Sequence, residues 1–293
     1  MSLFDKVVKE ALIHQPHLSS LRIVVEKELL HHDILRIMRD NNLTAHLTFI
    51  GGTCLRSCYG GIRLSEDLDF TGGHDFSKEK LASMGRLITE SLHDKYNFQV
   101  VVGEPVKEGG NVDTWKIKIE TRPRSPSLPA QRINIDICAV PSYEKRPVML
   151  LNPYGVDMGT SGLIIQAQSR EEIYADKLLA FAFRPNRIKY RDVWDIIWLH
   201  NHGFSPRLEL LPHKLKDRNH QRDFFLHLFD ERLALLKEEP ERAEEFKQEM
   251  SRFLPAEQIS RILDQEQLWS FIICLLEDLS TQLKKDSLKK PLF

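Results

Sequence analysis

The sequence predicts an α+β fold, because a strand-rich segment lies between two helical ones. Residues 3–40 repeat apolar side chains three or four positions apart, which is the period of an amphipathic helix. From about residue 46, short β-like runs are separated by turn residues, and the helical period returns after residue 165. We therefore expect three parts: a helical lead-in at 1–45, a sheet-containing core at 46–165 and a helical domain at 166–293.

Five runs within the core have the composition and alternation of strands: 47–50, 67–71, 98–103, 114–121 and 132–140. Between the second and the third run, residues 77–95 have a helical pattern with Ser77 as its N-cap. Residues 122–130 contain three prolines, which cannot donate to a β ladder. We expect this segment to join two antiparallel strands.

The last part of the chain predicts helices. Ser169 and Glu172 have the spacing of a capping box at the start of a helix over 169–183. A second helix follows at 191–200, then a polar loop near 202–220 and three amphipathic helices.

Composition limits the class of protein. The chain has 293 residues, of which 42% are hydrophobic, and a formal net charge of -1, so a polyanion would have to be bound by a local patch. Four scattered cysteines lack the CxxC spacing of a zinc site and are expected to be reduced. The longest apolar runs are too short to cross a bilayer, and no signal peptide is evident. We expect a cytoplasmic protein without a membrane partner.

Carboxylates gather on two of the expected strands. Successive side chains of a strand face opposite ways, so Asp67 and Asp69 share one face, and Asp136 shares the polar face of its strand with Asn134. If the strands are neighbours, three carboxylates converge. Two such charges about 4 Å apart repel by roughly 4 kcal/mol at an effective dielectric near 20. The cluster therefore needs a cation, and oxygen ligands favour Mg²⁺ or Mn²⁺.

A glycine pair precedes this cluster. Gly51 and Gly52 allow a tight turn after the first strand, and Thr53 opens a short helix whose N-terminus can bind an anion. Each signal alone has a structural explanation: the glycines can make an ordinary turn, and Asp67 and Asp69 can be solvated on an exposed strand face. Their occurrence together favours phosphate and a divalent metal bound side by side.

These motifs resemble a known family. The stretch IGGTCLRSCYGGIRLSEDLDF, residues 50–70, resembles the core motif of nucleotidyltransferases related to DNA polymerase β, and more narrowly the AbiEii/AbiGii toxin family, which includes the MenT toxins. The resemblance continues in order through INIDI, EEIYADKLLAFAFR and RDVWD and covers roughly residues 48–200. It implies a nucleotidyltransferase domain with a mixed, mainly antiparallel sheet, followed by a helical domain that closes over the active-site cleft.

The resemblance also implies a reaction, the transfer of a nucleoside monophosphate from an NTP to an acceptor hydroxyl. Asp67, Asp69 and Asp136 would be catalytic and hold the metal. Gly51, Gly52, Thr53 and Ser65 would bind the nucleotide. We further expect modification of Ser65 to abolish activity, as in toxins of this family whose antitoxin is a kinase.

Two residues of the helical domain receive roles in the same way. Lys177 lies on an apolar helix face, where a lysine stem can simply snorkel, but the family places a nucleotide-binding lysine there. Asp192 and Asp195 can both stabilise a helix N-terminus, while the family implies an active-site role for Asp192. Nearby, Arg184, Arg187, Lys189 and Arg191 form a basic cluster that can contact phosphate or an acceptor strand.

The acceptor and partner follow from the resemblance alone. They would be the 3′ end of tRNA and a cognate antitoxin, which would make the protein a growth-inhibiting toxin. Two alternatives remain open at this point: nucleotidylation of a protein or small molecule, and a non-catalytic nucleotide-binding module with a regulatory role.

Overall fold

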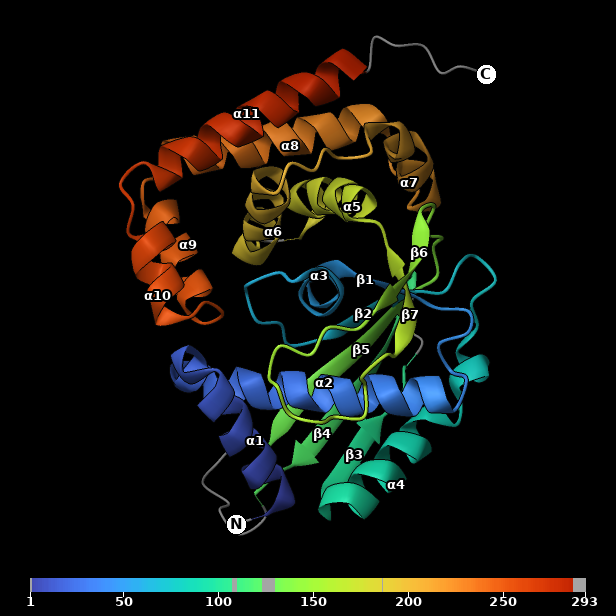
Figure 1. Cartoon of the computed structure of the whole chain (residues 1–293). Coiled ribbons are helices and arrows are strands. Elements are labelled where there is room, and N and C mark those ends of the chain that lie inside the picture. Colours follow the sequence, from blue (N-terminus) through green and yellow to red (C-terminus); the bar gives the residue numbers. More distant parts are fainter. Residues whose placement is uncertain (1, 107–109, 123–129, 186, 287–293) are drawn as a thin grey trace. The chain divides into compact units, whose positions relative to one another are not determined.

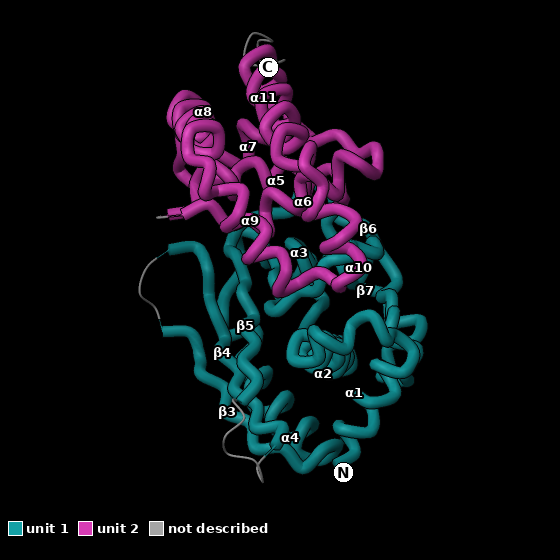
Figure 2. Tube along the Cα trace, turned by 90° about the vertical axis from the view of Figure 1, so that its left-hand side faces the viewer, with its two compact units in different colours: residues 1–168 teal, residues 169–293 magenta. Residues whose placement is uncertain are grey.

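The computed structural model describes residues 2–106, 110–122, 130–185 and 187–286. The chain forms two compact units, Met1–Gln168 and Ser169–Phe293, which Figure 2 shows in different colours. The N-terminal helices expected as a separate lead-in belong to the first unit. Among the described residues, no helix has the length and apolar character needed to cross a membrane.

The first unit is built on a seven-stranded sheet with the strand order β3-β4-β5-β2-β1-β7-β6 (Figure 1). The strands are β1 Thr48–Ile50, β2 Leu68–Thr71, β3 Gln99–Gly103, β4 Val112–Glu120, β5 Gln131–Cys138, β6 Lys145–Met149 and β7 Ile164–Gln168. The pairings β2–β5 and β1–β7 are parallel and the other four are antiparallel. The sheet is therefore mixed and mainly antiparallel, as expected.

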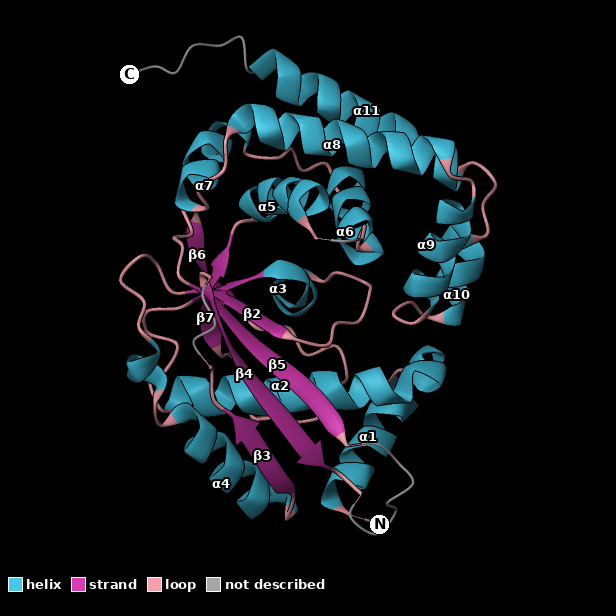
Figure 3. Ribbon diagram, turned by 180° about the vertical axis from the view of Figure 1, so that it is seen from behind, coloured by secondary structure: helices cyan, strands magenta, loops and turns pink. Residues whose placement is uncertain are grey.

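Helices of this unit cover one face of the sheet. They are α1 Leu3–His14, α2 Arg22–Asp40, α3 Gly51–Tyr59 and α4 Met84–Tyr96, with 3₁₀ turns at Pro16–Leu21 and Lys78–Leu81. α2 packs against β5 and α4 packs against β3. In Figure 3, β4 and β5 lie in front of α2, so their near face has none of the described helices of this unit across it.

Alternation along β4 and β5 explains this arrangement. Trp115, Ile117 and Ile119 of β4 are buried, as are three isoleucines of β5, whereas Lys116 and Lys118 are exposed between them. The buried face stabilises the sheet against α2 and α4, since each fully buried apolar side chain contributes about 1.5–3 kcal/mol. The polar face is left open to solvent.

The second unit is helical. Its elements are α5 Arg170–Phe183, α6 Tyr190–Asn201, α7 Leu211–Asp217, α8 Arg222–Glu238, α9 Glu241–Ser251, α10 Ala256–Gln258 and α11 Leu268–Asp286, with short 3₁₀ and π segments at Leu208–Leu210 and Ile259–Leu263. α5 packs on α6 and α8, α8 on α11, and α6 on α9. Ser169 caps α5 as expected, because its side chain accepts the Glu172 N–H at 3.0 Å.

Several sequence expectations need correction. The strands β6 and β7 were not anticipated, and β6 contains Pro147, which weakens any strand signal. The helix expected over 77–95 is a 3₁₀ turn followed by α4, and Ser77 makes no side-chain cap. The polar loop near 202–220 contains α7. β4 and β5 are antiparallel neighbours, while residues 123–129 of the expected connection lie outside the described residues.

Candidate active site

Two of the three strand carboxylates are direct neighbours. β2 and β5 are parallel, and Asp69 is paired with Asp136 in their register. Paired residues of adjacent strands point to the same face, and the strands lie about 4.8 Å apart. Leu68 and Ile135, the preceding pair, are buried on the opposite face. The sheet therefore holds two carboxylates side by side on its polar face.

The third carboxylate lies one step along the same strands. Asp67 comes directly before β2, and its Oδ1 accepts the backbone N–H of Asn134 at 3.1 Å. Asp136 is itself oriented by β4, because the Thr114 hydroxyl donates to its Oδ1 at 2.6 Å. Backbone and side-chain donors on β4 and β5 thus fix how two of the three carboxylates point.

The glycine pair lets other groups approach the end of β1 closely. Gly51 has a positive φ of 75°, and a Cβ there would lie 2.8 Å from Asp69 Oδ2. A Cβ on Gly52 would collide with the buried guanidinium of Arg63. The helix α3 begins at Gly51, two residues earlier than the sequence indicated. The N-terminus of α3, with its free backbone N–H groups, therefore lies next to the Asp69 carboxylate.

Thr53 supports this site from within the core. It is fully buried, and its hydroxyl donates to the backbone carbonyl of Asp67 and lies 2.6 Å from Ser65 Oγ. These hydrogen bonds hold the segment that leads into β2 against α3. In this arrangement any phosphate contact from Thr53 would come from its backbone N–H.

A buried polar network on α2 holds the same segment. Glu28 Oε1 accepts the Ser65 N–H at 2.8 Å, while Glu28 Oε2 accepts from Arg56 Nε at 3.0 Å and from the Tyr154 hydroxyl. His31 Nε2 lies 3.0 Å from the carbonyl oxygen of Glu66. Sequence reasoning missed Glu28, although a glutamate on the apolar side of a helix was an available signal.

Charge and burial fix the ionisation of this network. Burial lowers the pKa of His31, so its imidazole is neutral at pH 7. Burial alone would lower the pKa of Arg56, but the Glu28 charge raises it above its usual range. Burial, with the Glu28 charge, raises the pKa of Tyr154. Arg56 therefore stays a cation beside Glu28, and Tyr154 stays protonated and can donate to it at neutral pH.

In the second unit, Lys177 is held by two carboxylates. Its side chain is 10% exposed, and its Nζ lies 2.7 Å from both Asp192 Oδ1 and Asp195 Oδ2. Arg184 Nε lies 2.8 Å from the other oxygen of Asp192. Burial alone would raise the pKa of Asp192, but the charges of Lys177 and Arg184 lower it well below its usual range. Asp195 was not expected to join this group.

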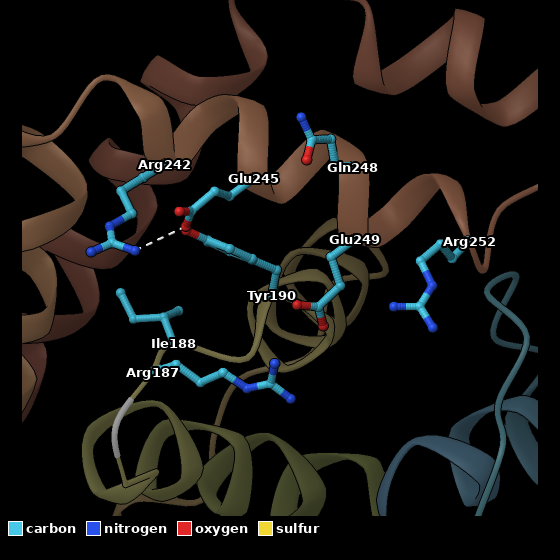
Figure 4. A pocket seen from close by; sticks show the side chains of 8 residues that line it. All are labelled: Arg187, Ile188, Tyr190, Arg242, Glu245, Gln248, Glu249 and Arg252. Atoms are coloured by element: carbon cyan, nitrogen blue, oxygen red, sulfur yellow. Dashed lines mark hydrogen bonds and ion pairs between the residues drawn. The ribbon is translucent and has the colours of Figure 1, made fainter.

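Arg187, another member of the expected basic cluster, lines a pocket of the second unit (Figure 4). The pocket of about 430 Å³ is lined by Arg187, Arg242, Arg252, Glu245 and Glu249, among others. Arg242 is paired with Glu245 at 2.9 Å, and Arg191 Nε lies 3.7 Å from Glu249 Oε1. The expected basic cluster is thus interleaved with glutamates.

The donor set at the sheet suits a hard divalent cation. Asp69 and Asp136 are the two carboxylates that would share it, since they are paired in register, and oxygen ligands suit Mg²⁺ or Mn²⁺. Across the described ranges, no three Asp, Glu, His or Cys side chains are grouped closely enough to hold a metal ion. Asp67, one step away and bound to Asn134, would have to turn to become a third ligand.

Comparison with known proteins gives a family and a fold. The family model described as nucleotidyl transferase AbiEii toxin, type IV TA system, matches residues 33–271. MenT4, a nucleotidyltransferase toxin from Mycobacterium tuberculosis, has a TM-score of 0.59 at 15% identity, with 97% of this chain and 93% of that chain covered. JHP933 from Helicobacter pylori has a TM-score of 0.49 at 18% identity, with 90% and 94% covered. No curated protein matches.

Proposed function

The chain belongs to the nucleotidyl transferase AbiEii toxin family of type IV toxin-antitoxin systems, and from this premise we propose that it transfers a nucleoside monophosphate from an NTP to the 3′-terminal hydroxyl of tRNA. The observation that carries the proposal is the register pairing of Asp69 with Asp136 beside the N-terminus of α3. It puts two carboxylates next to backbone N–H groups that can bind phosphate.

Each residue of the site has a role in this reaction. Asp67, Asp69 and Asp136 would hold Mg²⁺ or Mn²⁺, and the bound cation would neutralise charge on the triphosphate and on the attacking oxygen. Asp136, whose Oδ1 accepts from the Thr114 hydroxyl, would also accept a proton from the acceptor hydroxyl. Gly51 and Gly52 let Asp69 and Arg63 approach the start of α3, where backbone N–H groups would bind the β and γ phosphates.

Lys177 and Asp192 would position the nucleotide. Lys177 presents a positive charge that Asp192 and Asp195 hold in one place. A lysine restrained by two carboxylates loses little side-chain freedom when it binds a phosphate. Asp192 therefore acts on the nucleotide through Lys177 and Arg184, both of which it contacts.

A labelling experiment tests the proposal against its alternatives. The purified protein is incubated with each α-labelled NTP, Mg²⁺ and total RNA. We expect label on small RNA, sensitive to removal of the 3′ hydroxyl. Label on protein or a small molecule would support nucleotidylation of another acceptor, and no label with any NTP would support a non-catalytic module.

Matched variants test whether the labelling reaction depends on the carboxylates of the candidate site. Asp69→Asn and Asp136→Asn are expected to reduce transfer about 100-fold or more, because each removes a charge needed in the transition state. Asp94→Asn is the control, since Asp94 is an exposed aspartate on α4 away from the polar face of the sheet. Undiminished transfer in Asp69→Asn would refute the assigned site.

The antitoxin that the family implies can act at Ser65. Ser65 lies two residues before Asp67 and is 6% exposed. Its backbone N–H donates to Glu28 Oε1. A phosphate there would add a charge near -2 beside Glu28 and displace the segment that leads to Asp67. We expect Ser65→Asp to abolish transfer and Ser65→Ala to keep most of it, with exposed Ser19→Asp as the control. Full activity in Ser65→Asp would refute this regulation.

A further inference from the structure

The polar face of β4 and β5 carries three cations beside the carboxylates, and we propose that they bind the phosphate backbone of the RNA acceptor. These residues, Lys116, Lys118 and Arg132, are called the basic strip below. The inference rests on the proposed function, because it names where the acceptor lies at that same site.

The register of β4 and β5 places the basic strip on the same face as Asp136, further along these two strands. Thr114 is paired with Asp136, Lys116 with Asn134, and Lys118 with Arg132. Residues two apart on one strand lie about 6.6 Å apart on the same face. Lys116 therefore lies one such step along β4 from Thr114, the partner of Asp136. The pair Lys118 and Arg132 lies two steps from the pair Thr114 and Asp136. Consecutive phosphates of an extended single strand are separated by a distance of the same order.

The basic strip is available to a ligand. All three side chains are exposed, and none of the described helices of the first unit crosses this face of β4 and β5 (Figure 3). Lys118 is 50% exposed and lies 3.3 Å from Glu120 Oε1, a surface pair that contributes little. Within the described residues, Lys116 and Arg132 form no ion pair. Two full positive charges thus face solvent next to the site.

Charge also decides the direction of the bound strand. The carboxylates can contact a backbone phosphate only through a bound cation, whereas the basic strip attracts phosphates directly, so an end that carries no phosphate fits over Asp69 and Asp136. A 3′ terminus ends in hydroxyls and satisfies this condition. The geometry therefore assigns the 3′ hydroxyl to the carboxylates and the preceding two or three phosphates to the basic strip. A chain with a net charge of -1 needs such a local patch to bind RNA.

The test compares two triple variants of the full-length protein. The first removes the strip with Lys116→Gln, Lys118→Gln and Arg132→Gln. The second, Lys6→Gln, Lys9→Gln and Arg39→Gln, removes the same charge from exposed positions on α1 and α2. Binding of a single-stranded oligoribonucleotide labelled at its 5′ end, which leaves the 3′ hydroxyl free, and of total tRNA is measured by anisotropy between 50 and 200 mM salt, as suits counterion release.

We expect the strip variant to lose about two units of the salt slope of log K, since each single-strand phosphate contact contributes about 0.7. Its KM for RNA should rise at least about tenfold with kcat unchanged, while stabilisation by NTP stays at the wild-type level. The control should keep the wild-type slope. An unchanged slope in the strip variant, or an equal loss in the control, would overturn the inference.

The same measurements distinguish a failure of the proposed reaction from a failure of the basic strip. If the wild-type protein binds RNA through the strip but places label only on protein, the reaction assignment fails and the strip stands. If label enters RNA equally well in both triple variants, the reaction stands and the strip fails.

Discussion

Lys177 is bound to Asp192 and Asp195, so its charge serves the fold of the second unit as well as any bound phosphate. Sequence alone could place Lys177 on an apolar helix face and match it to the family lysine. It could not show that Asp195 is the second partner, because that contact depends on how α5 and α6 pack. The distinction matters for mutagenesis, since loss of activity in a Lys177 variant can have either cause.

A double variant separates the two causes. Lys177→Met leaves both aspartates buried with one fewer cation, and we expect it to lower the free energy of unfolding by about 3–5 kcal/mol. Adding Asp195→Leu removes one of the two negative charges that Lys177 neutralises and should restore part of this stability. Transfer should remain absent in both, as measured by labelling beside urea unfolding. Recovery of activity along with stability would show that Lys177 has only a structural role.

Asp192 gives the protein a pH-dependent stability with a defined sign. Its pKa in the folded protein is lowered by Lys177 and Arg184, against the effect of burial. A lowered folded pKa stabilises above the unfolded value of about 3.9, and that contribution is lost as the pH falls through the folded pKa. We expect wild-type stability to fall below about pH 4 more steeply than that of Asp192→Asn, in urea unfolding at pH 2–6. Parallel pH profiles would contradict this.

At the level of elements, local pattern was sufficient for β1 to β5 and insufficient for β7 and β6 at one end of the sheet. The five expected strands are β1 to β5, each within two residues of its predicted ends. β7 pairs with β1 through Phe49 and Ala167, a contact across more than a hundred residues that no local alternation encodes. The parity rule did place Asp69 and Asp136 on one face, while their direct pairing depends on the parallel alignment of β2 and β5.

The helix α2 was expected only as part of a lead-in, yet it holds the segment before β2. Glu28 satisfies the Ser65 N–H, Arg56 and Tyr154 at once. Replacing it leaves the Arg56 Nε–H and the Ser65 N–H without this acceptor, and each unsatisfied group costs about 1–3 kcal/mol or more when charged. The partners could not be identified from the sequence because they come from three separate segments.

This role of Glu28 predicts that the variant Glu28→Ala loses both stability and transfer activity. We expect its unfolding free energy to fall by about 3–5 kcal/mol, as for a broken buried ion pair, and its transfer rate to fall because Asp67 loses its support. Glu28→Gln keeps an acceptor for the Ser65 N–H and should lose less of both. Glu10→Ala on α1, an exposed glutamate, serves as the control. A stable Glu28→Ala protein with full activity would contradict the role of α2.

For the molecule as a whole, the candidate residues divide between two compact units. Asp67, Asp69 and Asp136 belong to Met1–Gln168, whereas Lys177 and Asp192 belong to Ser169–Phe293. The carboxylates that would hold the metal therefore lie in one unit with its own core. Metal binding can be measured there as a stability effect, without nucleotide or acceptor.

Mg²⁺ should stabilise the wild-type protein by binding only its folded form. At a concentration 100 times the Kd, linkage gives about 2.7 kcal/mol, which scanning calorimetry detects as a rise in Tm. Asp69→Asn should show no such rise. In EDTA the difference in Tm between this variant and the wild type should be smaller than in Mg²⁺, because neither protein then gains stability from the metal.

The dependence of this stability difference on metal distinguishes a carboxylate that binds the cation from one that supports the fold. A structural aspartate loses stability on substitution whether or not metal is present, whereas a metal ligand loses only the increment that metal supplies. Asp94→Asn should follow the wild type in both buffers. If Asp69→Asn is destabilised equally in EDTA and in Mg²⁺, the carboxylate supports the sheet and does not bind the cation, and the proposed reaction loses its metal site.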